Sequence, residues 1–153
     1  MRMNRPWIEA RIPHQGRMCL LDEVIDWDPH RIRCRTGTHR APDNPLRAHD
    51  RLGVACGIEY AAQAMALHGA LAVGVRDASA GGASRVGLLA SVRDARLHVL
   101  RLDDIENDLN CEAALLAGDS LTALYEFALR DRDRILLSGR ASVVLDAGGR
   151  LRL

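Results

Sequence analysis

The sequence VACGIEYAAQAMALHGALAV, residues 54–73, decides how this chain folds. It is dominated by Ala, Val, Leu and Met and contains no Pro, so it predicts one helix that is buried on most of its sides. Glu59 is the only formally charged residue between Arg51 and Arg76. Because a carboxylate in apolar surroundings is costly to bury without a partner, the purpose of Glu59 is the first question that the sequence raises.

The segments on either side of this helix predict β-strands. Before it, residues 31–38 alternate between arginine and smaller side chains, which is typical of a half-buried strand, and they are expected to pair with residues 20–27 as a hairpin. Gly74 is expected to end the helix, and the small residues of 76–85 are expected to form a flexible connection. The remaining segments predict strands at residues 85–93, 109–117, 121–129 and 135–145, and residues 96–100 are either a continuation of the first of these or a separate short strand.

One helix among five or six antiparallel strands predicts an α+β architecture, with a single domain over residues 1–153. A helix rich in small side chains can lie close to a curved sheet. This arrangement is typical of the hotdog fold, in which one sheet wraps around a central helix. Since a half-wrapped helix leaves part of the sheet rim exposed, a homodimer or a higher oligomer is expected.

Composition excludes several classes of function. The chain has 153 residues, 48% of them hydrophobic, and a net charge of +1, so it can bury one core and has no strong attraction to nucleic acids or acidic membranes. It contains no Lys, which excludes Schiff-base and P-loop lysine chemistry. No metal or other cofactor is expected, because the cysteines have no zinc-ligand spacing. The start lacks an apolar signal-peptide core, which favours a cytoplasmic protein with reduced thiols.

The apolar run at residues 52–75 is long enough to cross a membrane, but three polar side chains interrupt it, which favours a buried helix. On a helix, Gln63 lies four residues after Glu59 and shares its face. His68 falls on the opposite face and is interpreted as a histidine of the helix surface or of an interface.

Two roles for Glu59 follow from the residues alone. Apolar surroundings are expected to raise the pKa of its carboxyl, which would make it a proton donor near neutral pH. Alternatively, Glu59 pairs with Arg47 or Arg51 and anchors the long loop at residues 39–53. If Glu59 is an acid, the candidates for a matching base are three histidines in loops, His14, His39 and His49.

Three motifs resemble one enzyme family. They are IPHQGRMCLLDEV at residues 12–24, APDNPLR at residues 41–47 and GIEYAAQAMA at residues 57–66. Together they resemble the entry segment, the start of the active-site loop and the central helix of the hotdog 3-hydroxyacyl-acyl-carrier-protein dehydratases. The combination of PHQGRM, NPLR and GIEYAAQAMALHGAL is most similar to the small dehydratase-like proteins of aryl-polyene-type pigment gene clusters.

The resemblance implies a reaction and its partners. The substrate would be a 3-hydroxyacyl chain on an acyl carrier protein, and the product its 2-enoyl thioester. In the family, a His removes the proton alpha to the thioester and an acid on the helix, matched here by Glu59, protonates the departing hydroxyl. The two residues come from different subunits, which implies an obligatory dimer, either of this chain or with another dehydratase.

The sequence departs from the family at the histidine that acts as the catalytic base. The Gly-His-Phe-Pro segment that carries the family's His is missing, and His49 lies nearest to its place. We favour His14 as the base, because Asp50 beside His49 would stabilise the imidazolium. The expected catalytic residues are Glu59, His14 and His49, and the expected substrate-binding residues are Asn44, Gly53 and Gln63. A hotdog thioesterase and a non-catalytic supporting subunit remain alternatives.

Overall fold

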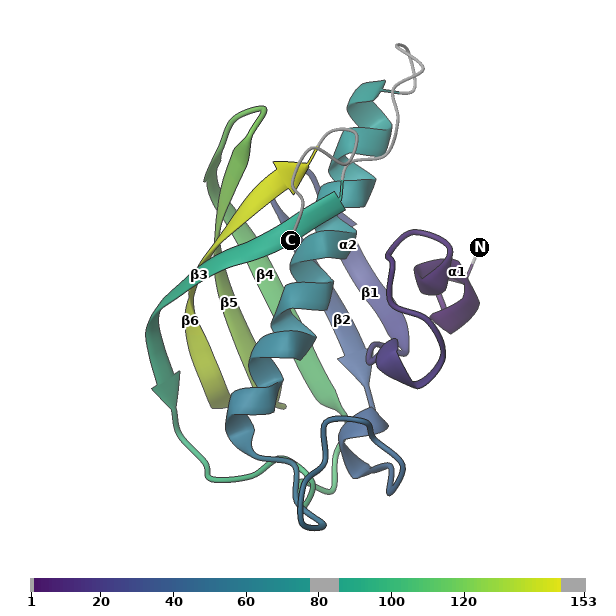
Figure 1. Ribbon diagram of the computed structural model, residues 1–153, viewed down its shortest axis with the longest axis vertical. Helices are drawn as coiled ribbons and strands as arrows, with labels where there is room; N and C mark the ends of the chain where they lie inside the picture. The colour runs from purple at the N-terminus through teal and green to yellow at the C-terminus, as the bar shows by residue number, and fades with distance from the viewer. Residues whose placement is uncertain (1, 78–85, 147–153) are drawn as a thin grey trace.

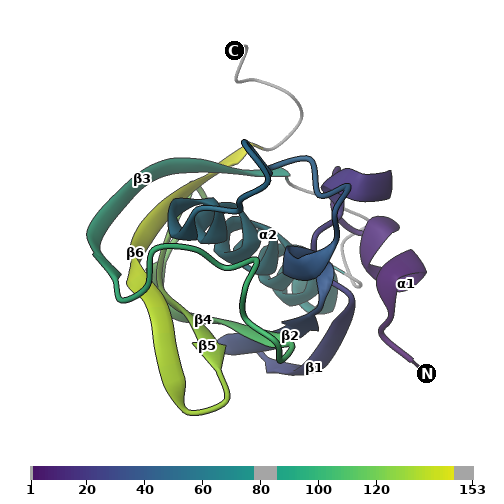
Figure 2. The same ribbon diagram turned by 90° about the horizontal axis from the view of Figure 1, so that it is seen from below.

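The computed structural model describes residues 2–77 and 86–146. Six strands form one antiparallel sheet in the order β1-β2-β4-β5-β6-β3, and one long helix, α2 (Gly57–Asp77), lies in its hollow. Figures 1 and 2 show the sheet curving around α2. The strands are β1 (Glu23–Asp28), β2 (Arg31–Thr36), β3 (Val86–Leu97), β4 (Leu109–Gly118), β5 (Thr122–Asp131) and β6 (Arg134–Asp146). The predicted hotdog architecture is confirmed.

The central helix differs from its predicted bounds at both ends. Residues Val54–Cys56 form a short 3₁₀ turn, η3, so α2 begins only at Gly57. A Cβ atom at Gly57 would lie 2.8 Å from a methyl of Leu137 and 2.9 Å from a methyl of Leu129, so Gly lets the helix start close against β5 and β6. The expected stop at Gly74 is wrong, because a helix tolerates an internal Gly at a cost of about 1 kcal/mol.

The first hairpin is confirmed with shorter strands. Burial in β2 alternates as predicted, with Ile32, Cys34 and Thr36 facing the core. The arginines of the other face are ion-paired: Arg33 contacts Asp26, and Arg35 contacts carboxylates on β1 and in the loop before β4. The predicted strands at residues 85–93 and 96–100 correspond to one strand, β3, whose register shifts between Arg93 and Arg96.

A short helix near the N-terminus, α1 (Arg5–Glu9), was not predicted. The Asn4 side chain accepts a hydrogen bond from the backbone N–H of Trp7, and Pro6 stands in the first turn, which are both ordinary start signals. Figure 2 shows α1 outside the curved sheet, on the side of β1. The predicted flexible connection at residues 76–85 lies mostly outside the described residues.

His68 corrects the prediction of a surface or interface histidine. It lies opposite Glu59 on α2, as expected, but it is fully buried because the sheet covers that side. Its Nε2 lies 2.8 Å from the carbonyl of Asp28, which can only accept, so Nε2 carries the hydrogen. In the neutral form, the Tyr125 hydroxyl therefore donates to Nδ1, 2.8 Å away. Within residues 2–77 and 86–146, no helix combines the length and apolar character needed to cross a bilayer.

Candidate functional site

Glu59 and His14 meet at the first turn of α2. Nε2 of His14 lies 3.2 Å from Oε1 of Glu59, and the two side chains are 27% and 36% exposed. His14 comes from the loop between α1 and the 3₁₀ turn η1 (Gly16–Met18). Both residues belong to the same chain, and the implied arrangement of acid and base on different subunits stays a prediction. The structure thus brings a carboxylate and an imidazole together at a partly open surface.

The loop that carries His14 is held in place by the two residues that follow it, Gln15 and Gly16. The amide of Gln15 donates to the carbonyls of Glu9 and Ile12, at 2.6 and 3.3 Å. Gly16 has a φ of +60°, a conformation that Gly adopts without steric cost, and the N–H of Cys19 donates to its carbonyl. These contacts give the His14 backbone a defined position beside α2.

Gln63 connects this loop to Glu59. Its Oε1 accepts from the N–H of Leu20 at 2.9 Å, and its Nε2 donates to the carbonyl of Met18 at 2.7 Å. The same Nε2 lies 3.4 Å from Oε1 of Glu59. The side chain is fully buried, and all of these contacts are to protein. Its expected role in substrate binding stays a prediction.

The pKa of Glu59 is lowered, so the expectation that apolar surroundings raise it is wrong. The hydrogen bond from His14 is the largest cause of the lowering, and the hydrogen bond from Gln63 adds to it. Burial acts in the opposite direction, but it is outweighed because the carboxyl is only half-buried. In this open state, Glu59 is a carboxylate at neutral pH.

The other two candidate bases lie elsewhere. His39 is fully buried, with Nε2 2.9 Å from the carbonyl of Ile105, and burial lowers its pKa. His49 is exposed at the tip of a tight turn, where it and Asp50 have φ values of 53° and 59°. Among the described residues, neither histidine has a hydrogen bond or ion pair with Glu59.

Asn44 and Gly53, both expected to bind substrate, have different surroundings. Asn44 is buried and donates to the Tyr60 hydroxyl and the Thr38 carbonyl, each at 2.9 Å, so it joins the loop to α2. Gly53 is exposed, and a side chain there would meet open space. Their roles toward substrate stay predictions.

The alternative in which Glu59 anchors the long loop through Arg47 or Arg51 is wrong about the partner. Arg47 donates instead to the carbonyls of Asp50 and Arg40, at 3.5 and 3.3 Å. Within the described part of the chain, Arg51 forms no ion pair with Glu59. The anchoring contacts of the loop therefore come from other residues, among them Asn44.

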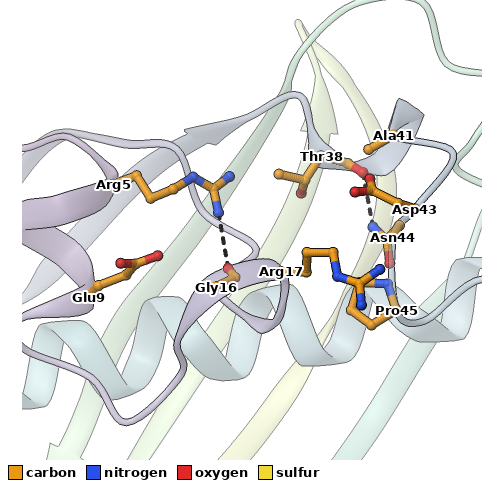
Figure 3. A pocket seen from close by; sticks show the side chains of 9 residues that line it. All are labelled: Arg5, Glu9, Gly16, Arg17, Thr38, Ala41, Asp43, Asn44 and Pro45. Carbon is orange, nitrogen blue, oxygen red and sulfur yellow. Dashed lines mark hydrogen bonds between the residues drawn. The ribbon is translucent and has the colours of Figure 1, made fainter.

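A pocket of about 370 Å³ adjoins the loop that follows His14. Figure 3 shows the Arg17 side chain extending from η1 toward Asn44 and Pro45, with Arg5 and Glu9 at the other end. Arg5 is already bound to Asp22 at 2.5 Å. Neither Glu59 nor His14 lines this pocket, so it is separate from the carboxylate–imidazole pair.

Comparisons with known proteins agree with the resemblance seen in the motifs. A chain of the dehydratase heterocomplex ApeI:P from Xenorhabdus doucetiae is 21% identical, with a TM-score of 0.75 over 92% of this chain and 91% of that one. A conserved protein, PA5202, from Pseudomonas aeruginosa is 15% identical, with a TM-score of 0.60 over 94% and 96% of the two chains.

A thioesterase from Pseudomonas aeruginosa shares the fold as well, with 14% identity and a TM-score of 0.57 over 80% of this chain and 79% of that one. Comparison with curated proteins finds no match. The family model of the ApeP-like dehydratases, described as ApeP dehydratase, matches residues 6–147. Because that match covers nearly the whole chain, the protein belongs to the ApeP-like dehydratase family.

Proposed function

We propose that this protein removes water from a 3-hydroxyacyl chain carried as a thioester on an acyl carrier protein, and that the product is the 2-enoyl thioester. The observation that carries the proposal is the 3.2 Å contact between His14 and Glu59, in a chain of this dehydratase family. An imidazole and a carboxyl held side by side provide the base and the acid that an elimination of water requires.

The proposed reaction breaks the Cα–H bond and the Cβ–O bond, forms the Cα–Cβ double bond and releases water. His14 takes the alpha proton, which the thioester carbonyl makes acidic, and the carboxyl of Glu59 protonates the departing hydroxyl. Glu59 has then lost a proton to the released water, and His14 holds the proton taken from the substrate. Because the two side chains are in direct contact without substrate, His14 can pass a proton to Glu59 after the product leaves.

The lowered pKa of Glu59 belongs to the chain without substrate, where hydrogen bonds from His14 and Gln63 stabilise the carboxylate. An acyl chain that covers the pair removes water from both side chains. Removal of water disfavours the charged form of a carboxyl, so Glu59 is expected to take up a proton when the acyl chain binds. Substrate binding would thereby produce the neutral acid that the reaction needs.

A partner subunit is part of this proposal. About a third of each of the two side chains is exposed, so the chain by itself does not enclose a substrate. The similar structure from Xenorhabdus doucetiae is a heterocomplex. We propose that a second subunit, either another copy of this chain or a different dehydratase, covers the pair.

Mass spectrometry of the carrier-bound acyl chain tests the function. The protein is incubated with a 3-hydroxyacyl-acyl-carrier protein, and the intact mass is read with and without Glu59→Gln. If the carrier-bound acyl chain loses the mass of one water with the unmodified protein and not with Glu59→Gln, the result supports a dehydratase. Release of a free acid would mean a thioesterase. The same incubation is repeated with a partner dehydratase added. No change of mass with the chain alone, together with an activity of the mixture that Glu59→Gln does not reduce, would mean a supporting subunit without this activity.

A further inference from the structure

One buried hydroxyl, that of Tyr60 on α2, joins three segments of the chain. Its oxygen lies 2.9 Å from Nδ2 of Asn44, in the long loop, and 2.9 Å from Oγ1 of Thr38, in the 3₁₀ turn η2 (Thr38–Arg40) that follows β2. The Thr38 hydroxyl in turn lies 2.7 Å from the carbonyl of Leu20, in the segment before β1. Tyr60 is fully buried, and burial raises the pKa of its phenol to about 12, so the hydroxyl keeps its hydrogen.

The two ends of this row fix the direction of its hydrogen bonds. Oδ1 of Asn44 accepts from the N–H of Leu46, so Nδ2 is the atom that donates to Tyr60 and to the carbonyl of Thr38 (Figure 3). At the other end, the carbonyl of Leu20 can only accept. Among the described residues, Oγ1 of Thr38 is the acceptor that the structure gives the Tyr60 hydrogen. The hydrogen bonds therefore run one way, from the long loop through the helix to Leu20.

We propose that Tyr60 is a positioning residue, which holds the loop of His14 at a fixed distance from Glu59. Tyr60 follows Glu59 directly on α2, and Leu20 ends the segment that begins at His14 and passes through η1. Through Thr38 and Leu20, the hydroxyl sets how far that segment lies from the helix, and with it the 3.2 Å contact between His14 and Glu59. The effect on catalysis rests on the proposed function, whereas the effect on this contact does not.

Loss of the hydroxyl would release both loops. In Tyr60→Phe the ring still fills its place in the core, but Asn44 loses an acceptor and Thr38 loses a donor. Asn44 is buried, and a buried donor without a partner is costly, so the long loop is expected to shift until the amide reaches water. The segment that Thr38 holds through Leu20 then loses its fixed distance from α2.

Tyr125→Phe is the matched control. Tyr125 is also buried, burial likewise raises the pKa of its phenol to about 12, and its hydroxyl bonds to His68, on the opposite side of α2 from Glu59. Both substitutions remove one buried hydroxyl and keep the ring, so both should lower the midpoint of urea unfolding by similar amounts. Two further quantities are measured: the pKa of Glu59, from the ¹³C shift of its carboxyl by NMR, and kcat and KM for dehydration.

In Tyr60→Phe, the pKa of Glu59 is expected to rise by about half a unit, because the hydrogen bond from His14, the largest cause of its lowering, becomes longer. We expect kcat to fall about tenfold, with a smaller change of KM, because the two reacting groups are no longer held in place. Tyr125→Phe should change neither quantity. The NMR measurement needs no turnover, so it decides the inference even if the proposed function fails.

Thr38 provides a second test of the same row. Thr38→Val removes the next hydroxyl with little change of shape and should reproduce the rise in the pKa of Glu59, whereas Thr38→Ser keeps a hydroxyl and should retain the original pKa. If Tyr60→Phe does not fold, these two variants decide the inference. A folded Tyr60→Phe or Thr38→Val with the original Glu59 pKa would overturn it, as would an equal pKa change in Tyr125→Phe.

Discussion

The imidazole of His14 lies 3.2 Å from the carboxylate of Glu59, although one comes from the N-terminal loop and the other from the central helix. This contact joins the motifs at residues 12–24 and 57–66, two of the three on which the resemblance to dehydratases was based. It also explains how a lone carboxylate in an apolar helix is accommodated. The side chain is half-buried, and His14 and Gln63 both donate to the same oxygen.

Replacement of the proposed acid should separate chemistry from folding. Glu59→Gln keeps the shape of the side chain and removes its charge, so the fold should persist. Dehydration should fall by about 10²–10⁴-fold, the range for the loss of a positioned acid or base. Turnover and thermal unfolding are measured on the same preparations. A variant that unfolds more readily but keeps its turnover would assign Glu59 a structural role.

The two histidine candidates should respond differently. His14→Ala removes the imidazole in contact with Glu59 and should abolish turnover. His49 lies at an exposed turn with a φ of 53°, so His49→Asn, which tolerates that conformation, tests the side chain without straining the turn. We expect His49→Asn to raise KM and to leave kcat unchanged. If His49→Asn lost kcat and His14→Ala kept it, His49 would be identified as the base.

Stability should depend on pH through Glu59. The pKa of its carboxyl is lowered in the folded chain from the ordinary glutamate value of 4.5. The contact with His14 therefore contributes stability above a pH of 4.5, and this contribution is lost as the pH falls through the folded pKa. The original protein should melt higher than Glu59→Gln at pH 7, and the gap should close toward pH 3. A gap independent of pH would contradict the lowered pKa.

The buried pair of His68 and Tyr125 should matter for stability and not for activity. Tyr125→Phe leaves Nδ1 of the buried imidazole without its donor, at a cost of about 1–3 kcal/mol. Urea denaturation at pH 7 measures that cost. Because His68 lies on the opposite face of α2 from Glu59, kcat should not change. A large loss of turnover at unchanged stability would connect this pair to the site.

The sequence by itself determined the architecture, because its signals are local. Alternating side chains in residues 31–36 indicate a strand, because side chains on a strand repeat every two residues. The continuous run of small apolar residues around Glu59 indicates a buried helix. In the predicted helix at residues 54–73, Glu59 is the one charged residue, and the helical period places Gln63 on the same face. The entry motif at residues 12–24 contains His14, and its resemblance to the dehydratases indicated this residue as a candidate base.

The tertiary structure decided what these side chains touch. The pKa of Glu59 falls rather than rises, because the loop of His14 packs against the open side of the helix, while His68 is buried because the sheet covers the other side. Gln63 reaches backbone groups of Met18 and Leu20, and nothing in its own neighbourhood indicates those partners. Burial and long-range hydrogen bonds depend on which segments the folded sheet brings against the helix. The periodicity of a sequence predicts single helices and strands, but it does not predict which distant segments come into contact.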